Sequence, residues 1–179
     1  MSRRWPALEA AAAALAEDGR GPWADGLGRL AARVPLDGAR PRVYVEVRTQ
    51  PPTAATGCLP ELLRWIGADP FMVPPASRSA EVSWEELLEF DPQLVVYAVD
   101  GQGTDYAPEA FLSVEGWDRS EAAVHRRVFS VGAAPEPGPA LLEWARLLQD
   151  LVGEGFWGWP PAQASGLRRL GRPIQRERP

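Results

Sequence analysis

Apolar residues along the chain follow two repeating patterns, and the order of these patterns predicts the fold. Unbroken apolar runs, which are typical of strands buried on both faces of a sheet, cover residues 43–47, 94–98 and 128–131. A shorter run, residues 71–73, predicts a fourth strand. Between the runs, apolar residues recur at every third or fourth position, as they do on one face of a helix. Strands that alternate with helices indicate a mainly parallel sheet.

Start and stop signals place the helices between these strands. Ser83 followed by Glu86 forms the pattern of a capping box, and Asp91-Pro92 ends the helix that it opens. Pro139 suits the first turn of another helix. The helices predicted in this way cover residues 6–17, 22–34, 59–66, 83–91, 108–111, 119–125 and 139–152.

The length and the patterns together predict one α/β lobe. We expect a single three-layer lobe, with a central, mostly parallel sheet of about four strands flanked by helices and preceded by a short helical segment. Residues 1–40 would be this helical segment, residues 41–153 the lobe, and residues 154–179 a tail that is first aromatic and then basic. Two interpretations of the tail remain open. Its aromatic residues pack back on the lobe, which we favour, or they bind a partner.

Composition excludes several classes of function. The net charge of −5 does not favour binding to nucleic acid. Cys58 is the only cysteine and His125 the only histidine, so a disulfide within the chain, a cysteine-based zinc site and a multi-histidine metal site are all excluded. A Ser-His-Asp triad would have to use His125, which lies where a predicted helix meets a predicted strand. Asp100 to Gly103 (DGQG) lacks the spacing of a phosphate-binding loop, so nothing in the sequence indicates an enzyme.

The chain contains no apolar segment of the roughly 20 residues that a membrane span needs. The alanine-rich start is interrupted by Glu9 and makes a poor secretory signal. We therefore expect a cytoplasmic protein as the chain stands, or a periplasmic or extracytoplasmic one if its natural N-terminus is missing.

Ligands of parallel sheets bind in the loops that follow the carboxyl ends of the strands. The loop after the first predicted strand carries two consecutive prolines, which restrict it before any ligand binds. Arg48 could donate hydrogen bonds to amide carbonyls or a phosphate, and Gln50 could pair with amides. The candidate ligand-binding residues are Arg48, Thr49, Gln50, Pro51, Pro52, Thr53, Asp100 and Tyr106. The alternative is that they form ordinary surface.

The order of the segments resembles a known family. RVYVEV, the Pro-Pro loop, VSWEELLEFDPQLVV and GWDRSEAAVHRRVFSV are similar to the C-terminal lobe of periplasmic binding proteins for vitamin B12, ferric siderophores and haem, and most closely to the cobalamin-binding branch. The resemblance covers about residues 42–152. It implies a non-enzymatic component of an ABC importer that binds a corrinoid, or a similar tetrapyrrole or metal chelate, and requires no cofactor. It also implies that Glu85 docks on arginines of a membrane permease. The alternative is that Glu85 only favours the N-terminus of its helix.

The chain departs from the family pattern in ways that predict weak binding. Only about forty residues precede the matching region, too few for the family's N-terminal lobe. Ala140 stands where the family has an arginine near the ligand cleft. We therefore expect a homo-oligomer, or a separate chain that supplies the N-terminal lobe. A second hypothesis is an interaction or structural protein that kept the fold and lost the ligand.

Overall fold

Helices and strands alternate along most of the computed structural model, which describes residues 22–49, 52–56, 58–73, 80–98, 115–132, 135, 139–161, 163 and 168–170. The helices are α2 (Pro22–Ala32), α3 (Cys58–Trp65), α4 (Trp84–Phe90), α5 (Glu121–Val124) and α6 (Pro139–Val152), with a 3₁₀ turn η2 (Trp117–Arg119) and a π-helical turn η3 (Gly153–Trp157). The strands are β1 (Arg42–Thr49), β2 (Pro52–Ala54), β3 (Asp69–Pro70), β4 (Leu94–Tyr97), β5 (Val128–Ser130) and β6 (Arg168–Leu170).

The strands form one sheet in the order β2-β1-β4-β5-β6. β1, β4 and β5 are parallel neighbours, as the three long apolar runs predicted. β2 and β6 extend the sheet with antiparallel strands at its two edges, and β3 pairs in parallel with the first two residues of β1. The expected α/β class with a mostly parallel sheet is therefore confirmed.

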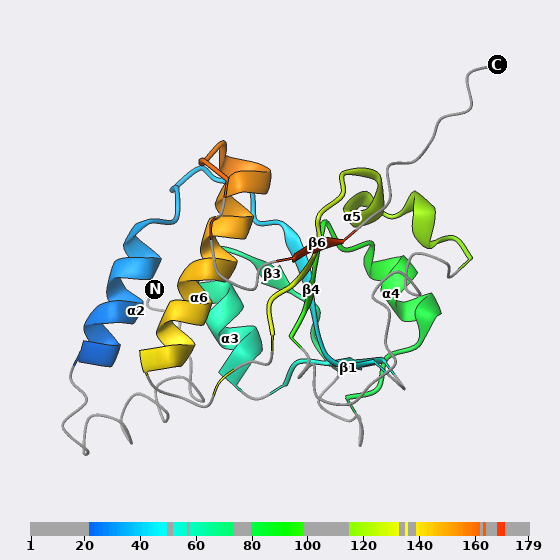
Figure 1. Ribbon diagram of the computed structural model, residues 1–179, viewed down its shortest axis with the longest axis horizontal. Helices are drawn as coiled ribbons and strands as arrows, with labels where there is room; N and C mark the ends of the chain where they lie inside the picture. Colours follow the sequence, from blue (N-terminus) through cyan, green and yellow to red (C-terminus); the bar gives the residue numbers. More distant parts are fainter. Residues whose placement is uncertain are drawn as a thin grey trace.

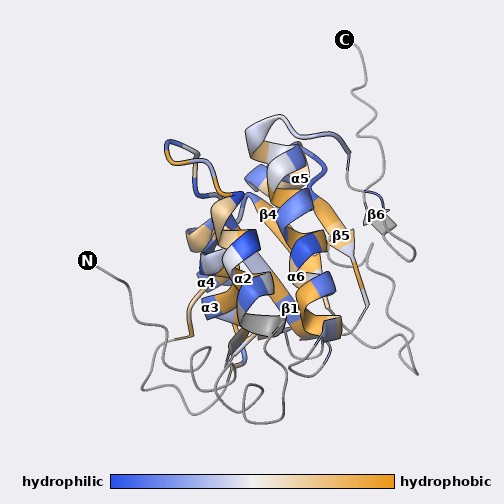
Figure 2. Ribbon diagram, turned by 90° about the vertical axis from the view of Figure 1, so that its left-hand side faces the viewer, coloured by the Kyte–Doolittle hydropathy of each residue, from blue (hydrophilic) through white to orange (hydrophobic). Residues whose placement is uncertain are grey.

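Helices cover both faces of this sheet, so the described part of the chain has three layers (Figure 1). α2, α3 and α6 lie on one face, over a core that includes Val45, Val96 and Phe129. The side chains of Tyr44 and Val95 point to the other face, where Trp117 is fully buried in the core beneath α4 and α5. β4 and β5 are mainly hydrophobic, whereas α2 and α6 carry polar residues on their outer sides (Figure 2). This arrangement explains why the strands appear in the sequence as unbroken apolar runs.

Two predicted boundaries on the outer side of β1 are wrong. The strand predicted at residues 71–73 lies instead at Asp69–Pro70, because Asp69 N donates to Pro41 O (2.8 Å) and Phe71 N to Val43 O (2.9 Å). Met72, in the middle of the predicted strand, is 45% exposed. The loop predicted to continue through Pro52 and Thr53 is the strand β2.

The aromatic start of the C-terminal segment packs back on the lobe as we favoured. Phe156 and Trp157 pack against the core beneath α6, and the indole Nε1 of Trp157 donates to the carbonyl oxygen of Ala39 at 2.9 Å. Gly67, at φ +92°, ends α3 and leaves room for this indole: a Cβ there would lie 2.6 Å from Trp157 Cη2. The close approach of glycine and tryptophan therefore fixes the start of the tail against α3.

Two predicted helices, at residues 6–17 and 108–111, lie outside the described residues. The helix predicted at residues 119–125 is divided into η2 and α5 by Ser120, whose hydroxyl caps α5. None of the helices that the structure describes is long and apolar enough to cross a membrane.

Candidate functional site

The carboxyl ends of the three parallel strands lie along one edge of the sheet, where a ligand is expected. At this edge β1 turns back on itself into β2, so that Arg48 pairs with Thr53 and Thr49 with Pro52. The structure thus brings four of the predicted residues together at the tip of a hairpin. Gln50, Pro51, Asp100 and Tyr106 lie outside the described residues.

The hairpin is held on both sides by backbone hydrogen bonds. Ala55 N donates to Val45 O across the hairpin, while Val82 N donates to Pro52 O and Ala54 N to Ala80 O on the outer side, each at 2.9 Å. Pro52 fits this strand because it is the first residue, where a missing N–H is tolerated. Pro52 and Thr53 therefore lie in a paired strand rather than in the proline-restricted loop that we expected.

Glu46 lies directly behind the hairpin and was not among the predicted site residues. It is 1% exposed, and the register of the β1–β2 pair shifts between Glu46 and Arg48. The hydroxyl of Tyr44 donates to Glu46 Oε2 at 3.1 Å. Burial raises the pKa of Glu46 to about 8, and the hydrogen bond from Tyr44 opposes this only in part. The carboxyl group is therefore mainly protonated at neutral pH.

A signal for Glu46 is present in the sequence. Within Val-Tyr-Val-Glu-Val it is the only charged residue of an otherwise apolar strand, and a strand covered on both faces has no solvent side for it. A carboxyl group in such a run must be paired or neutral, so the pattern of the strand alone marks Glu46 as unusual.

Glu85 lies in the first turn of α4 and is exposed. Its neighbour Glu86 is held by the cap, because Ser83 N donates to Glu86 Oε2 (2.8 Å) and Glu86 N to Ser83 Oγ (3.2 Å). The predicted capping box is therefore confirmed. Glu89 is also exposed, one turn along α4, so Glu85 and Glu89 present two carboxylates on one side of the helix.

Strand pairing places Arg48 beside Thr49 and opposite Thr53, with the buried, protonated Glu46 nearby in β1. Among the described residues, no group of three or more histidine, cysteine, aspartate or glutamate residues could hold a metal ion. His125 is exposed at the end of α5, where its Nε2 lies 3.5 Å from Glu121 Oε2.

Comparison with solved structures shows that this fold is similar to part of several periplasmic binding proteins. No family model matches the chain, and no curated protein matches it. Among solved structures, a periplasmic binding protein from Veillonella parvula is 19% identical with a TM-score of 0.63, over 76% of this chain and 50% of that one. The periplasmic haem-binding protein HutB of Vibrio cholerae is 16% identical with a TM-score of 0.61, over 77% and 56%.

The periplasmic vitamin B12-binding protein BtuF of Vibrio cholerae is also similar, at 16% identity and a TM-score of 0.55, over 78% of this chain and 52% of that one. The chain thus spans about half the length of the solved structures that it matches. At these identities the similarity establishes the fold, and the ligand has to be argued from the site.

Proposed function

We propose that the chain is a ligand-binding lobe related to the substrate-binding component of an ABC importer for vitamin B12 or an iron chelate. Its ligand would be a corrinoid, or a similar tetrapyrrole or metal chelate, bound at the hairpin edge without any chemical reaction. One observation carries the proposal: the parallel strands β1, β4 and β5 end together behind a hairpin, in a fold that matches about half of a haem-binding and of a vitamin B12-binding protein.

A single lobe would bind such a ligand weakly, because a half-cleft buries only part of the ligand surface. We expect a dissociation constant that is micromolar or poorer, which corresponds to a binding free energy no more favourable than about −8 kcal/mol. A second lobe, supplied by another copy or by a separate chain, would strengthen the binding.

Calorimetric titration of the full chain with cobalamin, cobinamide and haem tests the proposal. We expect measurable heat with at least one of them, and a weaker affinity for Arg48→Ala. The matched control is Arg40→Ala, since Arg40 is exposed just before β1, at the opposite end of that strand. If no ligand gives heat up to millimolar concentration, or if both variants bind as the wild type does, the ligand-binding proposal is wrong.

Glu85 would serve the same function by docking on arginines of a membrane permease, with Glu89 beside it. Charge reversal in Glu85→Arg should then weaken the association with a cognate permease and leave the heat of cobalamin binding unchanged. If the variant and the wild type associate equally well with the permease, Glu85 has no docking role and only favours the N-terminus of its helix electrostatically.

An interaction or structural protein that kept the fold is the second candidate. The observation that favours it is Ala140, which is exposed at the start of α6 where the related family has an arginine near the cleft. A methyl group cannot donate a hydrogen bond to a ligand. Absence of heat in the same titrations would select this candidate.

A further inference from the structure

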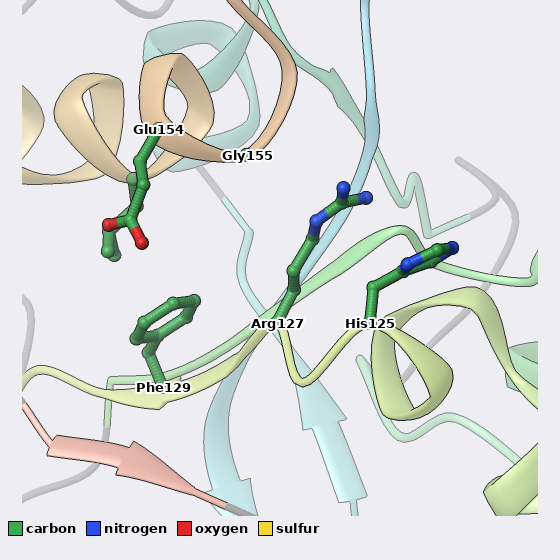
Figure 3. A pocket seen from close by; sticks show the side chains of 6 residues that line it. His125, Arg127, Phe129, Glu154 and Gly155 are labelled. Carbon is green, nitrogen blue, oxygen red and sulfur yellow. The ribbon is translucent and has the colours of Figure 1, made fainter. Parts of the chain in front are cut away.

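A second candidate site lies at the opposite edge of the sheet, at the amino end of β5. It is a pocket of about 160 Å³ lined by His125, Arg127, Phe129, Leu151, Glu154 and Gly155 (Figure 3). His125 and Arg127 come from the turn between α5 and β5, whereas Glu154 and Gly155 come from η3 beyond α6. The pocket is therefore separate from the hairpin at the carboxyl ends of the strands.

The side chain of Arg127 packs against η3. Its guanidinium carbon lies 4.3 Å from the centroid of the Phe156 ring. Gly155 provides the space, because a Cβ at that position would lie 3.3 Å from Arg127 Nε. A guanidinium held by its flat face on an aromatic ring keeps its N–H groups available around the edge, where they can donate to a ligand.

Arg127 differs from two other arginines of the lobe in its partners. Arg33 pairs with Asp150 at 2.7 Å and Arg42 with Asp91 at 3.1 Å. Among the residues that the structure describes, no hydrogen bond or ion pair involves the guanidinium of Arg127. Desolvation lowers the pKa of Arg127, and the nearby charge of Glu121 opposes this. A partly buried cation of this kind is stabilised by any anion that enters the pocket.

We propose that this pocket binds a small oxyanion, the phosphate or carboxylate group of a small molecule, through the guanidinium of Arg127 with His125 beside it. Its volume is well below the roughly 300–1,000 Å³ of sites for drug-sized ligands, and is enough for roughly ten water molecules. A corrinoid or haem cannot enter it, whereas a phosphate or carboxylate group can. Arginine is suited to such groups because its N–H pairs match two oxygens at once.

Glu154 allows a second test, in which the substitution is expected to strengthen binding rather than weaken it. Its carboxylate lies on the wall of the pocket across from Arg127 and His125 (Figure 3). A negative charge there repels an anion bound at Arg127. Removing the charge in Glu154→Gln should therefore tighten the binding that Arg127→Gln weakens.

The experiment is a titration of the full chain with sodium phosphate, and separately with sodium acetate, at an ionic strength held constant with sodium chloride. We expect saturable changes in the amide NMR signals of Gly155 and Phe129 and in the Nε signal of Arg127. The two titrations distinguish a phosphate site from a carboxylate site. Arg127→Gln should weaken binding at least tenfold, whereas the adjacent, exposed Arg126→Gln should bind as the wild type does.

Two further variants keep the test decisive if Arg127→Gln does not fold. Arg127→Lys retains the positive charge but lacks the planar set of N–H groups of the guanidinium, so it should bind the anion several-fold more weakly. Gly155→Ala should displace the guanidinium and weaken binding as well. The proposal is wrong if neither salt gives saturable changes, if chloride alone gives the same changes, or if the Arg127 variants that fold bind as Arg126→Gln does. Each of these outcomes leaves the hairpin proposal unaffected.

Discussion

Glu46 and Asp91 are carboxyl groups whose surroundings give them opposite roles. Glu46 is enclosed among apolar residues and is neutral at pH 7, since its pKa is raised to about 8. Asp91, with φ 46°, lies between α4 and β4 and accepts hydrogen bonds from two other elements. Glu46 makes the stability of the lobe depend on pH, whereas Asp91 links the end of α4 to β1 and α5 by hydrogen bonds.

Substitution of Glu46 by glutamine should change the pH dependence of stability. Because the pKa of Glu46 rises from 4.5 to about 8 on folding, the folded chain binds more protons than the unfolded chain between these values. The contribution of Glu46 to the free energy of unfolding therefore falls as the pH rises through this window, at a rate on the order of 1 kcal/mol per pH unit. Glu46→Gln has no such group and should gain stability relative to the wild type as pH rises.

Urea denaturation of both proteins at several values from pH 4 to pH 9 measures this difference. The relative stability of the variant should be flat at the acid end, where Glu46 is protonated in both states, and should flatten again above about pH 8. Parallel curves for the two proteins across the whole range would show that Glu46 is not buried in neutral form.

Asp91→Ala should destabilise the lobe by roughly 1–2 kcal/mol. Asp91 Oδ1 accepts from Glu121 N at 3.0 Å, while Asp91 Oδ2 and its carbonyl oxygen accept from Arg42. The ion pair itself is partly exposed and contributes little to stability. The loss comes mainly from the missing hydrogen bond to α5, and from the cost of placing alanine in a left-handed backbone conformation that aspartate tolerates better. Asp91→Asn keeps an oxygen acceptor and tolerates that backbone, and should lose less than Asp91→Ala in the same denaturation experiment.

At the scale of elements, local signals predicted the helices better than the short strands. α6 was predicted at its observed bounds, Pro139–Val152, because its proline start and its apolar stripe are both local. β2 and β6 have three residues each, and their strand conformation comes from pairing with β1 and β5. Nothing in Pro-Thr-Ala or Arg-Arg-Leu alone indicates such partners, so both strands were missed.

The contact between Gly67 and Trp157 should be sensitive to a single methyl group. Gly67→Ala places a Cβ 2.6 Å from the indole at a residue with φ +92°, so steric overlap and backbone strain add together. We expect a loss of roughly 2–4 kcal/mol in thermal or urea unfolding. Gly28→Ala is the control, because no atom lies within 4 Å of a Cβ there and the site is within α2. A Gly67→Ala protein as stable as the wild type would mean that the tail does not pack on α3.

At the scale of the whole molecule, the proposed half-cleft predicts self-association. A ligand edge normally covered by a second lobe exposes surface that tends to find a partner. We expect the protein to be at least dimeric, with residues 48–53 or the Trp157 and Trp159 segment near the contact. Light scattering should show the dimer, and Thr53→Glu should weaken it more than Arg146→Glu, which changes an exposed residue of α6. A monomer at high concentration would contradict the prediction.

The location of the candidate ligand edge followed from the sequence, but its detailed structure did not. Parallel strands alone place residues 48–53 at the carboxyl edge. The hairpin and the buried carboxyl group of Glu46 depend on how residues 80–82 and β4 pack around them. The pocket at Arg127 depends on contact between the turn before β5 and η3, about twenty-five residues further along the chain. No local pattern in the sequence indicates either of these contacts between distant segments.

The pairing of β5 with β6 has a consequence for synthesis on the ribosome. β6 follows β5 by about forty residues, so at roughly 5–20 residues per second β5 leaves the ribosome some seconds before its edge partner. During that interval the backbone N–H and C=O groups on one side of Val128–Ser130 have no strand beside them, and an open strand edge invites pairing with other chains. Nascent chains on one messenger RNA would therefore be most exposed to aggregation during the synthesis of residues 131–170.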